Sequence, residues 1–304
     1  MDNKLALLLI GAGASLWGII GLFVTSLYEM GFSPIQVVTI RALSATLFLV
    51  LYIIFKNRQL LKIKLADSKY FIGTGIFSFV LFNWCVFSAI KETSISVATI
   101  LLYTAPAFVT IFSRFIFKEL LTARKVLALL ITFIGCSFVI GILPNTNESI
   151  SLYGLILGLG SGLFYALYSI FGKFALRKYH SLTVTAYTFL FATIAVTPFS
   201  GLWLMVPLFA DIKVWVYIIG LGFLSTMLPF IFYTKGLNKI ESSQASIIAT
   251  IEPVVASLVG FLIFHEKLNV WQYFGIFLVI AAVIIVQETS KKTKKSVISN
   301  ELSL

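Results

Sequence analysis

The segment "SSQASIIATIEPVVASLVGFLIF" occupies residues 242–264 of the chain. It is long enough to cross a lipid bilayer, because a transmembrane helix needs about 20 mainly apolar residues. Yet it holds a carboxylate, Glu252, directly before a proline, Pro253. A charge at the bilayer centre costs about 2.5–3.5 kcal/mol on insertion scales, so we expect Glu252 to face a cavity or a partner rather than lipid.

The rest of the chain is equally apolar. Of its 304 residues, 59% are hydrophobic and 12% are charged, whereas a soluble domain carries about 25% charged residues. We therefore expect an all-α integral membrane protein whose short loops leave no room for a soluble domain. Apolar runs of about 20 residues predict ten transmembrane helices, at 5–27, 34–55, 70–90, 95–117, 126–143, 153–176, 182–206, 214–234, 242–264 and 271–287.

The positive charges predict the orientation. A net charge of +11 suggests nucleic acid, but the distribution argues against such a partner. If the N-terminus is cytoplasmic, most lysines and arginines fall on the cytoplasmic side, and only Lys91, Lys213 and Lys267 fall outside. This bias follows the positive-inside rule and predicts that both termini are cytoplasmic. The basic tail, 291–304, is expected to rest on anionic lipid headgroups.

The chain also contains a repeat. Shifting the sequence by 147 residues aligns "YFIGTGIFS" at 70–78 with "YIIGLGFLS" at 217–225. The same shift aligns the predicted helix breaker Pro106 with Pro253. We interpret 1–147 and 148–290 as two five-helix repeats. Because five is odd, the second repeat must enter the membrane from the opposite side, and such inverted repeats are typical of secondary transporters with a midplane site.

Four segments resemble a known family. They are "ASLWG" at 14–18, "LLYTAPAFVTIFSRFIFKE" at 101–119, "GLFYALYSIFGK" at 162–173 and "IEPVVASLVGFLIFHEKL" at 251–268. The chain is similar to the ten-helix, EamA-type members of the drug/metabolite transporter superfamily. The resemblance implies an exporter or exchanger of small metabolites, often amino acids, in the bacterial cytoplasmic membrane.

Glu252 is the first candidate site residue. It lies roughly 15 Å into its predicted helix, close to the bilayer midplane. Pro253 and Pro106 cannot donate backbone hydrogen bonds, so both repeats should carry a weakened helix at this depth. Glu252 would bind a substrate cation or a proton, or alternatively form a structural ion pair or hydrogen bond.

Other polar and aromatic groups complete the predicted site. Arg41, within a helix, could attract a substrate carboxylate, pair with Glu252, or extend to the headgroups. In the resembling family, an aromatic at the position of Tyr165 lines the pocket; beside Pro106 this chain has Ala105 where the family often has an aromatic. The candidate substrate-binding residues are Trp17, Asn83, Trp84, Tyr103, Tyr165, Tyr168, Tyr233 and Glu252.

These observations predict a carrier that works by alternating access. The resemblance favours a small amino acid or related metabolite, moved by an exporter or a proton-linked exchanger. The alternative is uptake or exchange of a quaternary amine such as choline, which aromatic faces would bind. An enzyme is disfavoured because no acid pair, nucleophile with a base or metal cluster is present. No cofactor is expected, and the protein would be a monomer or a homodimer.

Overall fold

The computed structural model describes residues 2–143 and 151–301, of which 288–301 are described as backbone only. Within the described chain every regular element is helical. The prediction of ten helices long and apolar enough to cross a membrane is confirmed for these residues. The predicted boundary between the repeats, 147–148, and the side chains of the basic tail lie outside the described part of the chain.

Several spans consist of more than one helical segment. The ten spans are α1 (Asn3–Gly18) with α2 (Ile20–Glu29); α3 (Pro34–Lys56); α4 (Ser68–Ile72) with η3 (Gly73–Val80) and α5 (Leu81–Glu92); α6 (Ile95–Leu102) with α7 (Ala105–Phe117); α8 (Ala123–Ile140); α9 (Leu152–Leu176); α10 (Ser181–Ser200); α11 (Ile212–Ile219) with η5 (Gly220–Met227) and α12 (Leu228–Leu237); α13 (Ser242–Ala249) with α14 (Ile251–Ile263); and α15 (Val270–Glu301). Short 3-10 helices η1 (Arg58–Leu61), η2 (Leu65–Asp67) and η4 (Leu202–Ala210) lie in the connections.

Two helices end earlier than the apolar runs that predicted them, for the same reason. The run predicted to reach residue 206 ends at Ser200, because Gly201 takes a left-handed backbone with φ 61°. The run predicted to reach 143 ends at Ile140, where Gly141 has φ 85°. A left-handed glycine terminates a helix whatever the hydropathy of the residues that follow.

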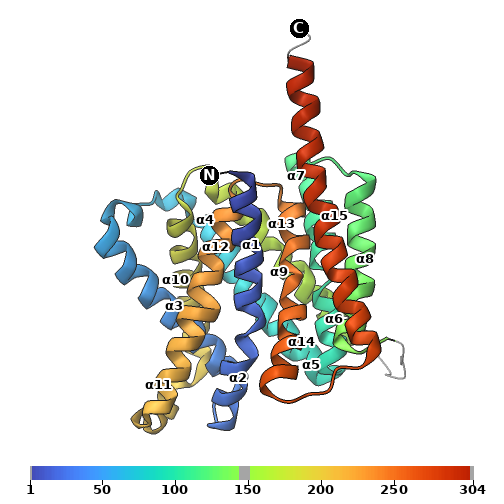
Figure 1. The fold of residues 1–304 in the computed structure, drawn as a ribbon. Coiled ribbons are helices and arrows are strands. Elements are labelled where there is room, and N and C mark those ends of the chain that lie inside the picture. The colour runs from blue at the N-terminus through green and yellow to red at the C-terminus, as the bar shows by residue number, and fades with distance from the viewer. Residues whose placement is uncertain (1, 144–150, 302–304) are drawn as a thin grey trace.

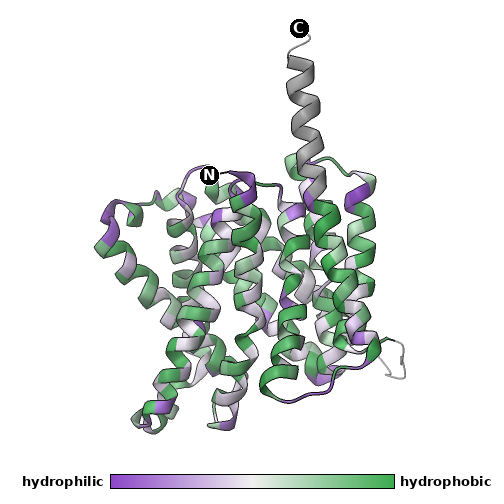
Figure 2. Ribbon diagram, viewed as in Figure 1, coloured by the Kyte–Doolittle hydropathy of each residue, from purple (hydrophilic) through white to green (hydrophobic). Residues whose placement is uncertain are grey.

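The two chain ends lie at the same end of the bundle (Figure 1), which we call the terminal end; the opposite end is the far end. The helix α15 continues past the predicted end at 287 and projects beyond the bundle. Figure 2 shows hydrophobic residues along the helices and hydrophilic residues gathered towards the two ends. This distribution suits a bilayer around the middle of the bundle.

The two spans that contain the predicted proline breakers are interrupted near their middle. The α6–α7 span breaks around Thr104, and the α13–α14 span breaks at Thr250. Each threonine hydroxyl donates a 2.6 Å hydrogen bond to a carbonyl of the preceding turn, on Leu101 and Ile247. Each of these carbonyls also accepts the threonine's own backbone N–H at 3.2 Å, so the hydroxyl adds a second hydrogen bond at the break.

Other features recur at the offset of the repeat. The π-helices η3 and η5 begin at Gly73 and Gly220 and are of equal length, so they lie 147 residues apart. The hydroxyls of Thr46 and Thr193, also 147 residues apart, are hydrogen-bonded at 3.1 Å. Direct contact between equivalent positions is what a two-fold axis produces where it passes through an interface.

The packing of α8 against α15 uses small residues at matching positions. Ala128 and Gly135 on α8 correspond to Gly275 and Ala282 on α15 at the 147-residue offset. A Cβ atom added at Gly275 would lie 2.7 Å from the backbone oxygen of Gly135 and from the backbone nitrogen of Val139. Small residues let helices approach this closely within a membrane.

We therefore expect Gly275→Ala to destabilise the protein by about 1–3 kcal/mol, because the added methyl group meets backbone that cannot move aside. The melting temperature in detergent should fall by about 5 °C. The matched control is Gly21→Ala on α2, where an added Cβ meets nothing within 4 Å. Since alanine is favoured over glycine in helices, this control should not lower the melting temperature. Equal effects at both positions would contradict the packing argument.

Candidate functional site

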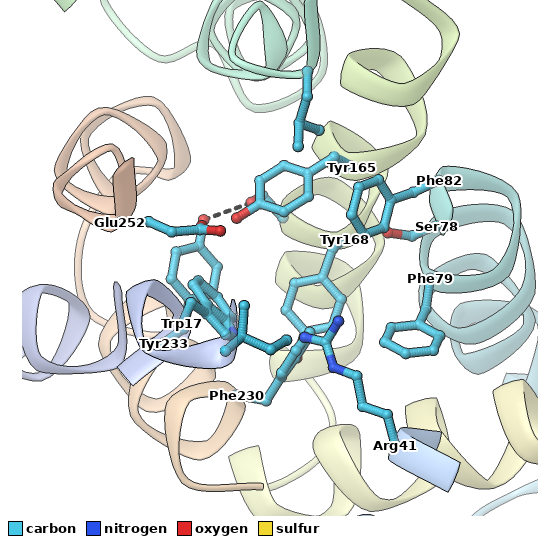
Figure 3. A pocket seen from close by; sticks show the side chains of 13 residues that line it. Trp17, Arg41, Ser78, Phe79, Phe82, Tyr165, Tyr168, Phe230, Tyr233 and Glu252 are labelled. Carbon is cyan, nitrogen blue, oxygen red and sulfur yellow. Dashed lines mark hydrogen bonds between the residues drawn. The ribbon is translucent and has the colours of Figure 1, made fainter. Parts of the chain in front are cut away.

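A cavity of about 160 Å³ lies near the middle of the bundle, between spans of both halves. Figure 3 shows the side chains that surround it. An engineered cavity of about 150 Å³ holds one benzene molecule, so the space suits one small compound. The lining residues are Trp17, Ile20, Arg41, Ser78, Phe79, Phe82, Leu102, Tyr165, Tyr168, Ser169, Phe230, Tyr233 and Glu252.

The break in the α13–α14 span places Glu252 in this cavity. Glu252 lies in the first turn of α14, directly after the interruption at Thr250. The helix α1 approaches the same turn at Gly18, where an added Cβ would lie 2.8 Å from the backbone oxygen of Glu252 and 2.6 Å from Cβ of Val255. Only glycine permits this approach, and it brings the adjacent Trp17 to the cavity that contains the carboxylate.

Arg41 is held by the two π-helices. Its Nε donates a 3.0 Å hydrogen bond to the hydroxyl of Thr226 in η5. Its guanidinium carbon lies 5.3 Å from the ring centre of Phe79 in η3 and 5.9 Å from that of Phe230. Phe79 and Thr226 are 147 residues apart, so equivalent positions contact Arg41 from two sides. These contacts hold the side chain while its terminal amino groups retain further donors.

The two charges of the cavity are not paired with each other. Within the described residues, neither Arg41 nor Glu252 forms a salt bridge. Figure 3 shows them on different sides of the cavity, with the ring of Tyr168 between them. The site therefore presents a guanidinium group and a carboxyl group, separated by aromatic surface, to whatever enters it.

The aromatic wall is fixed by hydrogen bonds and ring contacts. The hydroxyl of Tyr233 is bonded to Ser169 at 2.7 Å (Figure 3, dashed line), and that of Tyr168 to Thr234 at 2.5 Å. The ring of Trp17 packs edge-on against Phe230, with centres 5.0 Å apart. These contacts leave the rings little freedom to rearrange, so the cavity has a defined shape.

One donor in this wall has no partner. The side chain of Trp17 is 5% exposed, and its indole N–H makes no hydrogen bond among the described residues. Leaving a buried donor unsatisfied costs about 1–3 kcal/mol. An acceptor on a bound molecule would remove this cost.

Six predicted site residues meet at the cavity, and three lie elsewhere. The six are Trp17, Arg41, Tyr165, Tyr168, Tyr233 and Glu252. Tyr103 does not line the cavity but packs beside Cys136 and Val254. Trp84 is 57% exposed, and Asn83 is buried with its amide donating to the backbone of Phe79 at 2.7 Å. Both residues line a separate apolar groove between α3, α5 and α10.

The sequence did not single out several other lining residues. Ser78, Phe79 and Phe82 come from η3 and α5, and Ser169 and Phe230 come from α9 and α12. Ser78 lies in the repeated segment "YFIGTGIFS", which was the available signal. The π-helix changes the direction of the side chains after it, so regular helical periodicity does not identify the inward face.

The bond between Ser169 and Tyr233 joins α9 to α12, and it generates a stability prediction. Ser169→Ala leaves the buried phenol hydroxyl without this partner, which we expect to cost about 1–3 kcal/mol and lower the melting temperature. Tyr233→Phe should cost little more when Ser169 is already alanine, so a double-mutant cycle of melting temperatures should show coupling. Additive effects would mean that the bond contributes nothing.

Comparison with known proteins agrees with this architecture. The model of the EamA-like transporter family matches twice, at residues 4–141 and 152–287. An uncharacterized transporter of Archaeoglobus fulgidus is 31% identical over 89% of this chain and 94% of its own length. The Bacillus subtilis protein named uncharacterized transporter YxxF is 26% identical over 81% of this chain and 78% of its own.

A solved crystal structure shares the fold with a TM-score of 0.79, at 16% identity, covering 96% of this chain and 99% of that one. At this identity the likeness concerns the fold alone. The two family matches together cover most of the sequence and coincide with the ten described spans. The chain belongs to the EamA-like transporter family and is a multi-pass membrane transporter.

Proposed function

We propose that the protein carries small zwitterionic metabolites, with amino acids as the first candidates, by alternating access. The observation that carries this proposal is the cavity that holds both Glu252 and Arg41 without a salt bridge between them. An ammonium group would be attracted to Glu252, and a carboxylate to Arg41 and the Trp17 N–H. Unpaired charges are costly within a membrane, so a substrate of complementary charges gains affinity there.

Choline remains the second candidate because seven aromatic side chains line the cavity and their faces could bind a quaternary ammonium. The position of Arg41 disfavours it. The guanidinium already lies against the rings of Phe79 and Phe230, and its positive charge repels a substrate that is only cationic. A zwitterion satisfies both charges of the cavity, whereas choline satisfies one.

Alternating access is supported by the repeat. The two family matches, the equivalent π-helices and the Thr46–Thr193 contact all favour two related halves, 1–147 and 148–290, arranged about an axis through the bundle. We propose that these halves are inverted in the membrane. Two inverted halves can exchange conformations, which moves the opening of the central site from one side to the other.

We further propose the direction in which the chain is inserted. Most lysines and arginines lie in the connections of the terminal end, so the terminal end is assigned to the cytoplasm by the positive-inside rule. In a bacterial cytoplasmic membrane, export down a substrate gradient or exchange against protons would supply the energy. Glu252 is the group within the cavity that would carry the coupled proton.

The role of Glu252 is tested by Glu252→Gln in proteoliposomes, with counterflow of labelled amino acids as the readout. The substitution keeps the shape but removes the charge, and a charge-assisted hydrogen bond contributes about 1.5–3 kcal/mol. We expect at least about tenfold slower exchange and loss of its pH dependence. Glu29→Gln, at an exposed position at the far end, is the matched control and should behave as the wild type. Wild-type pH dependence in Glu252→Gln would contradict the role in proton coupling.

The role of the Trp17 N–H is tested by Trp17→Phe, which keeps an aromatic ring but removes the donor. We expect about tenfold weaker substrate binding, measured by the substrate-dependent rise in melting temperature. Without substrate, loss of the N–H should not lower the melting temperature, because this donor has no partner in the structure. Unchanged affinity would show that the N–H does not contact the substrate.

A further inference from the structure

At the terminal end, a glutamate of the first half caps a helix of the second half. The carboxylate of Glu119, which follows α7, accepts hydrogen bonds from the backbone N–H groups of Ser242 and Ser243 at 2.7 and 3.1 Å, and from the Ser243 hydroxyl. These residues form the first turn of α13. A carboxylate at a helix N-terminus satisfies otherwise unpaired donors and interacts favourably with the helix dipole.

A buried lysine reinforces this contact. Lys125, at the start of α8, is 2% exposed, and its ammonium group lies 2.6 Å from the carboxylate of Glu241 and 4.0 Å from that of Glu119. It also donates to the backbone oxygen of Leu120. The lysine therefore joins carboxylates on both sides of the junction. The buried ammonium group needs nearby acids to balance its charge, and Glu241 and Glu119 supply them from the two sides.

The same turn exists at the far end. The two non-glycine residues with left-handed backbone in the described chain are Lys118, with φ 57°, and His265, with φ 56°. Each immediately precedes a glutamate, Glu119 or Glu266. The glutamate N–H groups donate to the backbone oxygens of residues 113 and 260, respectively. All of these pairs are 147 residues apart, so both glutamates leave the backbone from equivalent, strained turns.

The side chains of the two glutamates differ in what they contact. Glu119 is 8% exposed, whereas Glu266 is exposed, and within the described residues its carboxylate accepts no hydrogen bond. The helix equivalent to α13 is α6, whose first residue, Ile95, is 70% exposed and whose N-terminus is capped by its own Ser94. The capping contact between the halves is thus present at the terminal end and absent, among the described residues, at the far end.

We infer that Glu119 and Glu266 act as alternating latches of the transport cycle: each carboxylate caps a helix of the other half in one conformation and releases it in the other. In the described conformation Glu119 closes the terminal end; in the opposite conformation Glu119 leaves α13 and Glu266 caps the first turn of α6, which closes the far end. The inference rests on the alternating access proposed above. It assigns the energetic difference between the two states to two named carboxylates outside the substrate cavity.

The test measures distances at both ends by double electron–electron resonance in nanodiscs. One spin-label pair is placed at Leu120→Cys and Lys239→Cys on the terminal end, and the equivalent pair at Lys267→Cys and Glu92→Cys on the far end. All four positions are exposed. The two native cysteines, both buried, are replaced by alanine in every protein measured.

Glu119→Gln should shift the ratio of the two conformations by about tenfold, through the loss of charge-assisted hydrogen bonds. The terminal-end pair should then move to longer distances and the far-end pair to shorter ones. Lys125→Gln should shift the ratio in the same direction. Glutamine is the residue at the equivalent position of the second half, Gln272. Glu266→Gln should leave the terminal end closed. The inference would be wrong if the terminal end stayed closed in both Glu119→Gln and Lys125→Gln. It would also be wrong if the terminal end opened equally in Glu266→Gln.

The outcome is separable from that of the proposed substrate. If wild-type proteoliposomes exchange no amino acid but Glu119→Gln opens the terminal end, the latches stand and the substrate assignment fails. If exchange occurs but both variants leave the distances unchanged, the proposed transport of amino acids is supported and the latch role of Glu119 and Glu266 is contradicted. Wild-type melting temperatures and elution volumes of the variants serve as the folding control.

Discussion

The structure depends on one constraint: in lipid, every backbone donor and acceptor must find a partner within the protein. A helix can be interrupted at membrane depth only where its backbone groups keep partners within the protein, and here the carbonyls of Leu101 and Ile247 accept both the backbone N–H and the hydroxyl of Thr104 and Thr250, respectively. These breaks adjoin the candidate site, because Leu102 and Glu252 line the cavity from either span. The chemistry of the site is therefore a consequence of how the helices are broken.

The π-helices apply the same constraint in another form. A wider helical turn keeps its backbone hydrogen bonds and redirects the side chains that follow. In η3 and η5 this redirection brings Phe79 and Thr226 against Arg41, and so allows a cation to be held beside the cavity. Arg41 would be costly against lipid; against a hydroxyl and two aromatic rings it is stabilised, yet not neutralised by an acid. That combination leaves its charge without an acidic partner among the described residues.

Much of this could be predicted from the sequence, and the parts that could not have physical reasons. Ten spans follow from apolar length, and the breaks follow from Pro106 and Pro253. The end of α10 could not be read from hydropathy, because the left-handed Gly201 is followed by equally apolar residues. Trp84 and Tyr165 have similar chemistry, but only Tyr165 faces the cavity, since helix rotation depends on packing and on the π-helices. The capping role of Glu119 depends on a helix 123 residues further along the chain.

We propose that the cavity recognises two opposite charges on one small molecule. The most direct measurement compares an amino acid with its decarboxylated and deaminated analogues, as competitors of binding to the wild-type protein in detergent. We expect the zwitterion to compete best and each single-charge analogue to bind at least about tenfold more weakly, because it loses one charge-assisted contact. If the amine, or choline, competed as well as or better than the amino acid, Arg41 would have no part in recognition and the zwitterion assignment would be wrong.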